Sequence, residues 1–220
     1  MLCTASIEKE KLNKANQHIV NTTDIQSLVS CDPIFFNIQA QYGIPPNWSR
    51  PQGFITLSKI ILEQQVSLQS ANAHFQKLNN YLPTFSPESI MKLSDEEMKS
   101  CQISRQKTTY LRSLSVAVME QKIDFAKLGK LSPLEVRQQL LALKGIGNWT
   151  ADIYLMFCLQ AKDIFPIGDV AVVTTMRELT TATTKEEILT HAEQWQPLRS
   201  LATYFLWHYY LKKRNRAALI

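Results

Sequence analysis

Residues 140–152 read LLALKGIGNWTAD, and this stretch decides the fold. It predicts a helix that ends at Leu143, a short turn, and a second helix that starts by Asn148. Gly145 and Gly147 lack a Cβ, so both can adopt positive φ and let the backbone approach another molecule closely. Ile146, between them, is expected to insert into the core. The amides left free at the start of the second helix form an anion site of the kind that fits a phosphate, although an ordinary helix–helix turn with a glycine cap explains the two glycines as well.

Helical signals continue on both sides of this hairpin. Apolar residues recur at spacings of three and four in five further segments, which gives each segment one apolar face. Those residues are Phe54, Leu57, Ile60 and Ile61; Ala71, Phe75 and Leu78; Leu111, Leu114 and Val118; Val136, Leu140 and Leu143; and Leu198, Leu201, Ala202 and Phe205. Cap-plus-proline pairs at Ser86-Pro87 and Ser132-Pro133, and capping boxes at Ser94…Glu97, Ser132…Glu135 and Thr184…Glu187, mark helix starts. The predicted fold class is all-α.

Two segments rich in helix breakers indicate a two-domain organisation. Residues 42–53 contain three prolines and two glycines, and residues 161–168 contain Pro166 and Gly168. We therefore predict a helical-bundle domain over residues 53–161 that carries the hairpin. Residues 1–52 and 162–220 form a second helical domain built from both ends of the chain.

Composition excludes several classes of protein. The 220 residues are 45% hydrophobic and 20% charged, with no apolar run long enough to span a membrane. The N-terminus lacks the pattern of a secretory signal, so we expect a cytoplasmic protein without a membrane partner. The four cysteines and four histidines show neither C-x-x-C nor H-E-x-x-H spacing, which argues against a metal–thiolate site. The net charge of +5 suits a polyanionic partner but is a weak signal by itself.

The order of several motifs is more specific than any one of them. The hairpin string is followed by FPIGD at residues 165–169, preceded by RPQGF at 50–54 and QQVS at 64–67, and completed by a motif that runs from Trp195 through Pro197, Arg199 and Ser200 to Trp207. Over residues 32–210 this resembles the helix–hairpin–helix DNA glycosylases, most closely their 3-methyladenine DNA glycosylase II branch. The N-terminal thirty residues are too few for the extra β-containing domain of larger relatives. The resemblance implies two helical domains flanking a cleft, and a monomer that flips alkylated purines out of double-stranded DNA and removes them.

Asp169 is the residue that the resemblance makes catalytic. Its other interpretation is a plain helix N-cap, and the two are compatible. Backbone amides and the helix dipole favour the ionised carboxylate, which can stabilise the oxocarbenium-like sugar formed as the glycosidic bond breaks. Asp152 and Asp163 are the nearest rival carboxylates, and neither stands at the motif position.

Aromatic residues are expected to receive the flipped base by stacking and cation–π attraction. Trp149 and Trp207 match family positions that line the base pocket, although both could be core residues. A tyrosine often found four residues after the hairpin tryptophan is Ile153 here, and Tyr154 is predicted to replace it. Gln65 matches the side chain that relatives insert into the duplex, and is otherwise a solvated loop residue.

Two further implications of the resemblance concern a nucleophilic lysine and a bound cation. Strand-cutting relatives carry a nucleophilic lysine where this chain has Trp149, so no Schiff base is expected there. The resemblance also implies that the backbone carbonyls of Leu141, Leu143 and Ile146 could hold a sodium or potassium ion. No other cofactor is expected.

Two alternatives remain open at this point. A glycosylase of the same superfamily could act on another damaged base, such as oxidised guanine, uracil or hypoxanthine. A non-catalytic helix–hairpin–helix module could bind DNA structure only, but such a module needs neither Asp169 in its motif nor the aromatic Trp149.

Overall fold

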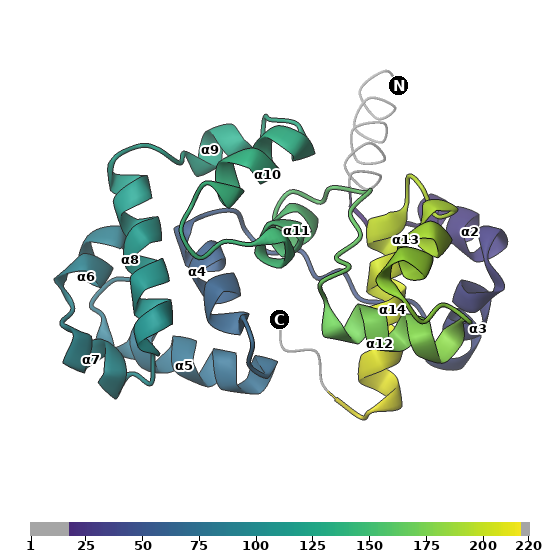
Figure 1. Ribbon diagram of the computed structural model, residues 1–220, viewed down its shortest axis with the longest axis horizontal. Helices are drawn as coiled ribbons and strands as arrows, with labels where there is room; N and C mark the ends of the chain where they lie inside the picture. The colour runs from purple at the N-terminus through teal and green to yellow at the C-terminus, as the bar shows by residue number, and fades with distance from the viewer. Residues whose placement is uncertain (1–17, 217–220) are drawn as a thin grey trace, which may run out of the picture. The chain divides into compact units, whose positions relative to one another are not determined.

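The computed structural model describes residues 18–216, and these contain helices and loops but no strand, which confirms the all-α prediction. The helices are α2 (Thr22–Cys31), α3 (Pro33–Tyr42), α4 (Phe54–Glu63), α5 (Leu68–Tyr81), α6 (Pro87–Lys92), α7 (Asp95–Ser100), α8 (Arg105–Met119), α9 (Phe125–Leu128), α10 (Pro133–Leu141), α11 (Asn148–Phe157), α12 (Val170–Leu179), α13 (Lys185–Glu193) and α14 (Arg199–Lys213) (Figure 1). Within this part of the chain, no helix combines the length and apolar character that crossing a membrane requires.

The described residues form two compact units. The first joins residues 18–49 to 160–216, so it is built from both ends of the described chain, and the second is the continuous stretch 50–159. The chain passes between the units at residues 49–50, inside the first breaker-rich region, and at residues 159–160, just before the second.

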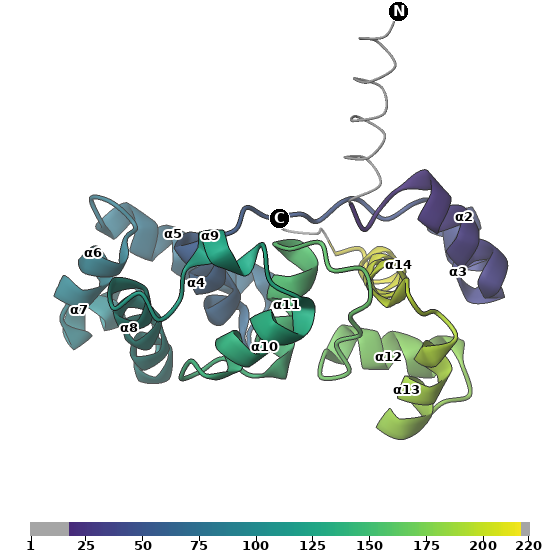
Figure 2. The same cartoon turned by 90° about the horizontal axis from the view of Figure 1, so that it is seen from above.

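Helix α14 organises the first unit. It contacts α2 and α3 on one flank and α12 on another, and α13 packs against α12 (Figure 2). Ten consecutive residues of α14, from Ser200 to Tyr209, are buried. Phe205 packs edge-on against Phe35 of α3, whose ring also meets Trp195, so aromatic contacts join α3 to the C-terminal segment of this unit.

Helix α4 organises the second unit. It packs against α5, α8 and α11, and α6 and α7 cover α8. The predicted apolar face is correct, because Leu57, Ile60 and Ile61 have no exposed surface. The α10–α11 pair forms the hairpin and joins this bundle through the contact of α11 with α4.

The helix starts are the best-predicted local features. Ser86 and Ser132 cap α6 and α10 with proline at the first position, as expected. All three capping boxes are formed, with reciprocal side-chain bonds at the starts of α7, α10 and α13.

Candidate functional site

The hairpin turn is held by one glycine rather than two. Gly145 has φ of +90°, and a Cβ there would lie 2.1 Å from the ring of Tyr110, so no other residue fits without movement. Ile146 is buried in the core, as predicted, and its amide donates to the carbonyl of Leu143. Helix α10 ends at Leu141, two residues before the predicted position.

Gly147 differs from the prediction. Its φ is −101° and its ψ −179°, an extended conformation open to any residue, and a Cβ there would meet nothing within 4 Å. Gly147 is the N-cap of α11, and no side chain caps the helix at this position. Glycine is therefore not needed here for a positive φ. Because glycine has no side chain that could cap the helix, the amides of the exposed helix start stay available to an anion.

The residues that follow Gly147 place one predicted aromatic at the surface and one inside. Trp149, in the first turn of α11, is half-buried. Tyr154 has no exposed surface, and its ring packs near that of Phe125 with a centroid separation of 6.2 Å. Burial raises the pKa of Tyr154 above its ordinary value. This position argues against the stacking role predicted for Tyr154, and neighbouring Ile153 is buried as well.

Asp169 begins α12 in the first unit. Its Oδ1 accepts hydrogen bonds from the amides of Ala171 and Val172, at 2.9 and 3.0 Å, which is the N-cap geometry anticipated from the sequence. The same oxygen accepts the indole N–H of Trp207 at 3.1 Å. Three neutral donors thus fix this carboxylate, while Val170, beside it, is 75% exposed. Asp169 and Trp207, two separate sequence predictions, are brought into direct contact.

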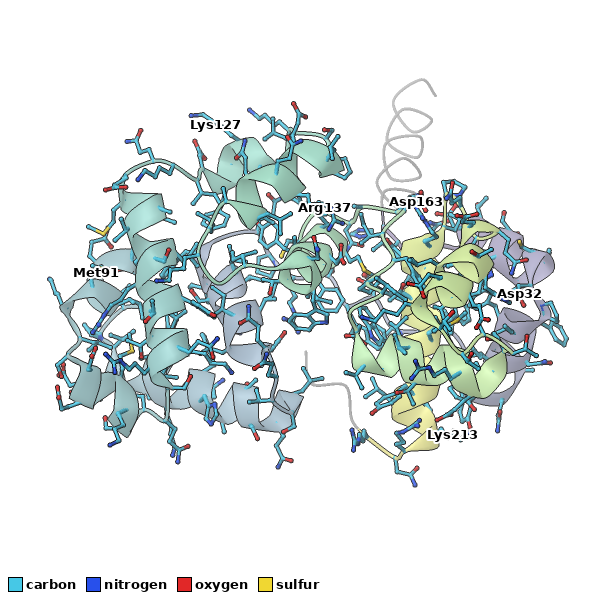
Figure 3. The ribbon with its side chains drawn as sticks, in the orientation of Figure 1. Asp32, Met91, Lys127, Arg137, Asp163 and Lys213 are labelled. Carbon is cyan, nitrogen blue, oxygen red and sulfur yellow. The ribbon has the colours of Figure 1, made fainter. Side chains whose placement is uncertain are left out.

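Residues of the C-terminal motif hold the loop that leads to Asp169. Arg199 makes a two-pronged bond to Asp163, with nitrogen–oxygen distances of 2.6 and 2.9 Å (Asp163 is labelled in Figure 3). The buried hydroxyl of Ser200 donates to the carbonyl of Ala161 and accepts from the amide of Ile164. These bonds tie residues 161–164 to the start of α14, so the motif serves to position the loop.

Neither rival carboxylate has the surroundings of Asp169. Asp163 is engaged by Arg199, as above. Asp152 is buried on α11 and forms an ion pair with Arg137 of α10 (labelled in Figure 3). Burial raises the pKa of Asp152, and the arginine opposes that shift. Both residues therefore serve as structural ion-pair partners.

Trp207 lies in an aromatic cluster that sequence reasoning missed. Its ring centroid is 5.9 Å from that of Tyr204 and 6.1 Å from that of Trp48. Trp48 belongs to the breaker-rich loop, where nothing in the local pattern marks it as buried, yet only 5% of it is exposed. The cluster fixes the indole whose N–H reaches Asp169.

The loop between α4 and α5 contains the predicted duplex-inserting residue. Gln65 is exposed and has φ of +57°, an uncommon conformation for a residue other than glycine. The side chain of Gln64, unlike that of Gln65, points toward the hairpin. Its Nε2 donates to the carbonyl of Gly145 and to the hydroxyl of Thr150, both at 2.9 Å. The sequence predicted no role for Gln64.

Metal ligation by side chains has no candidate in residues 18–216, where no three His, Cys, Asp or Glu residues gather in a suitable cluster. The monovalent cation implied for the hairpin would use carbonyls instead, from Leu141, Leu143 and Ile146. Carbonyl oxygens are hard ligands suited to such an ion, and the Leu143 carbonyl already accepts one hydrogen bond within the turn. The donor set fits, and the ion remains a prediction.

Comparison with known proteins identifies the family to which this sequence is similar. Residues 58–199 match the family described as HhH-GPD superfamily base excision DNA repair protein. The chain is 31% identical over 173 residues to DNA-3-methyladenine glycosylase 1 of Schizosaccharomyces pombe, covering 74% of this chain and 75% of that protein. It spans less of two Bacillus subtilis relatives, 41% and 43% of their lengths.

Solved structures of 3-methyladenine DNA glycosylases also match this fold. The crystal structure of a DNA-3-methyladenine glycosidase from Bacillus halodurans matches with a TM-score of 0.73 at 26% identity, over 88% of this chain and 92% of that one. The S. pombe 3-methyladenine DNA glycosylase in complex with abasic DNA matches with a TM-score of 0.77 at 27% identity, over 84% and 95% of the two chains.

Proposed function

The chain belongs to the HhH-GPD superfamily of base excision DNA repair proteins, and we propose that it is the DNA glycosylase that removes alkylated purines such as 3-methyladenine and 7-methylguanine. The observation that carries the proposal is the carboxylate of Asp169, fixed by two backbone amides and the indole of Trp207. These three donors are neutral, and Asp152 and Asp163 are each paired with an arginine.

The reaction needs an anion more than a proton donor. An N-alkylated purine carries positive charge, so the bond from C1′ to its nitrogen can break with the electron pair leaving on the base, which becomes neutral. The sugar that remains is oxocarbenium-like, and a fixed carboxylate stabilises it. Water then adds to C1′ and releases a proton, which leaves an abasic site. In this proposal Asp169 supplies the carboxylate.

Other predicted residues are given binding roles. The amides at the glycine-capped start of α11 would hold a phosphate, which positions the DNA without reading sequence. Gln65 would enter the duplex, and the face of half-buried Trp149 would meet the electron-poor base. Trp207, which is buried beside Trp48 and Tyr204, would act through its hydrogen bond to Asp169. A sodium or potassium ion on the hairpin carbonyls would add positive charge near that phosphate. We propose that the protein acts as a monomer and needs no other cofactor.

We also propose that the enzyme leaves the strand intact. Trp149 stands where strand-cutting relatives place lysine, and an indole nitrogen cannot form an imine with the opened sugar. Borohydride added during turnover should therefore trap no protein–DNA adduct, and the product strand should break only after alkali or heat. A trapped adduct would assign the nucleophile to another amine, with Lys144 beside the hairpin the first to replace.

The test of the proposed function is base release. Purified protein is incubated with methylated duplex DNA in excess EDTA, and the freed bases are identified by chromatography. We expect 3-methyladenine or 7-methylguanine, with activity unchanged by the chelator. Release of no alkylated base would refute the proposal, and release only of oxidised guanine, uracil or hypoxanthine would reassign the substrate.

A further inference from the structure

Gln64 lies between the two DNA-binding segments of the second unit. It directly precedes Gln65, at the C-terminal end of α4, and its side chain is half-buried rather than solvated. One amide nitrogen donates both to the carbonyl of Gly145 in the hairpin turn and to the hydroxyl of Thr150 in α11, each at 2.9 Å. Thr150 is only 2% exposed, so its hydroxyl is shielded from water.

Helix α8 supports the same two segments from one face. Lys107 Nζ donates to the carbonyl of Leu62 at 2.6 Å, at the end of α4, and burial lowers the pKa of this lysine. Tyr110, one turn further along α8, lies directly under Gly145. Residues three apart on a helix share a face, so one face of α8 contacts both the end of α4 and the hairpin turn.

We propose that Gln64 is a positioning residue that holds the Gln65 loop and the hairpin in fixed register, so that a helix start binding a phosphate and a side chain entering the duplex act on one DNA molecule together. This inference rests on the proposed function. It assigns Gln64 no contact with DNA or with the reacting atoms. Without the two bonds each segment keeps its own fold but loses its alignment with the other.

The alignment should matter only where the duplex is opened. An undamaged duplex needs the hairpin alone, whereas a duplex with an abasic site also receives the inserted side chain. Gln64→Met keeps the volume but removes the donor, and Thr150→Val keeps the shape but removes the hydroxyl acceptor. Thr150→Ser retains the hydroxyl, and Gln76→Met, an exposed change on α5, is the matched control.

The experiment measures binding, without turnover, to two duplexes of equal length, one undamaged and one with a tetrahydrofuran abasic analogue. For Gln64→Met and Thr150→Val we expect the preference for the abasic duplex to fall about tenfold, as for loss of one or two hydrogen bonds, with undamaged DNA bound within about twofold of wild type. Thr150→Ser and Gln76→Met should keep the full preference. The double variant should lose no more than the larger single loss, because both changes break the same link.

Two results would overturn the inference. Unchanged preference in Gln64→Met and Thr150→Val would show that the link positions nothing. Equal loss of binding to both duplexes, accompanied by a lower melting temperature, would show a role in folding only, and Thr150→Val decides the matter if Gln64→Met fails to fold. Failure of the proposed function is read separately, as absence of base release by the wild-type protein.

Discussion

Helices α11 and α12 begin in opposite ways, although both starts lie in motifs that mark the family. Helix α11 is capped by Gly147, which has no side chain, so its amides can meet an anion from outside. Helix α12 is capped by Asp169, whose own carboxylate occupies the amides of Ala171 and Val172. The orphan amides of a helix start are therefore left without a side-chain cap in one unit, whereas two of them fix the carboxylate proposed as catalytic in the other.

In our proposal the start of α11 binds DNA and the start of α12 carries the chemistry, and substitutions at each start test this division. The largest effect is expected at Asp169. Asn caps a helix about as well as Asp, so Asp169→Asn should preserve the fold while removing the charge. Base release should drop by at least about a hundredfold, as for loss of one key electrostatic group, with binding to an abasic analogue retained. Near-normal turnover would return Asp169 to the role of a cap.

Stability should separate the two glycines of the hairpin. Gly145→Ala forces a Cβ toward the ring of Tyr110 at positive φ, and we expect it to destabilise the protein by about 3 kcal/mol or more. Gly147→Ala is the matched control, because its Cβ would meet nothing and its φ is ordinary. Chemical denaturation of the three proteins checks this. Equal losses at both positions would show that the two glycines have the same conformational role.

Gly147→Asp converts the start of α11 to the kind found at α12. The new carboxylate can accept from the amides that the phosphate would use, so DNA affinity should fall about tenfold to a hundredfold for all sequences alike. Stability should change by only about a few tenths of a kcal/mol, since glycine and aspartate are both tolerated at this cap. Binding isotherms over a range of salt concentrations test this, with Gly147→Ala expected to stay near wild type. A loss confined to some sequences would mean that the hairpin reads bases.

At the start of α12, a change at Trp207 should lower the rate of base release less than a change at Asp169 does. Trp207→Phe removes the N–H that Asp169 accepts but keeps an aromatic face among Trp48 and Tyr204. The rate of base release should fall about tenfold, the order expected for one hydrogen bond to a charged group. Single-turnover rates measure this directly, with circular dichroism to verify the fold. An unchanged rate would show that the two backbone amides suffice to hold the carboxylate.

The sequence predicted these helix starts well because capping is local chemistry. Three capping boxes, two serine–proline starts and the Asp169 cap each depend on residues within four positions of one another. Glycine identity, by contrast, does not determine φ, which is why Gly147 was expected to adopt the same conformation as Gly145 and does not.

Long-range contacts lay beyond the local pattern. Gln64 bonds to residues more than eighty positions away, and Trp48 reaches Tyr204 and Trp207 from a loop. The stretch 150–156 of α11 is buried at every position, so periodicity could not show that Tyr154 points into the core. The resemblance named positions for Asp169 and Trp207, but their hydrogen bond joins residues 38 positions apart and lies beyond any local pattern.

The central claim is that α11 binds the DNA and Asp169 performs the chemistry. A titration of protein against a trace amount of methylated duplex, under single-turnover conditions, tests it most directly, because it gives a limiting rate and a half-saturating concentration. Asp169→Asn should lower the limiting rate at least about a hundredfold and leave the half-saturating concentration unchanged, while Gly147→Asp should raise that concentration about tenfold or more at an unchanged limiting rate. If Gly147→Asp lowered the limiting rate, or Asp169→Asn acted only through binding, the division between the two helix starts would be wrong.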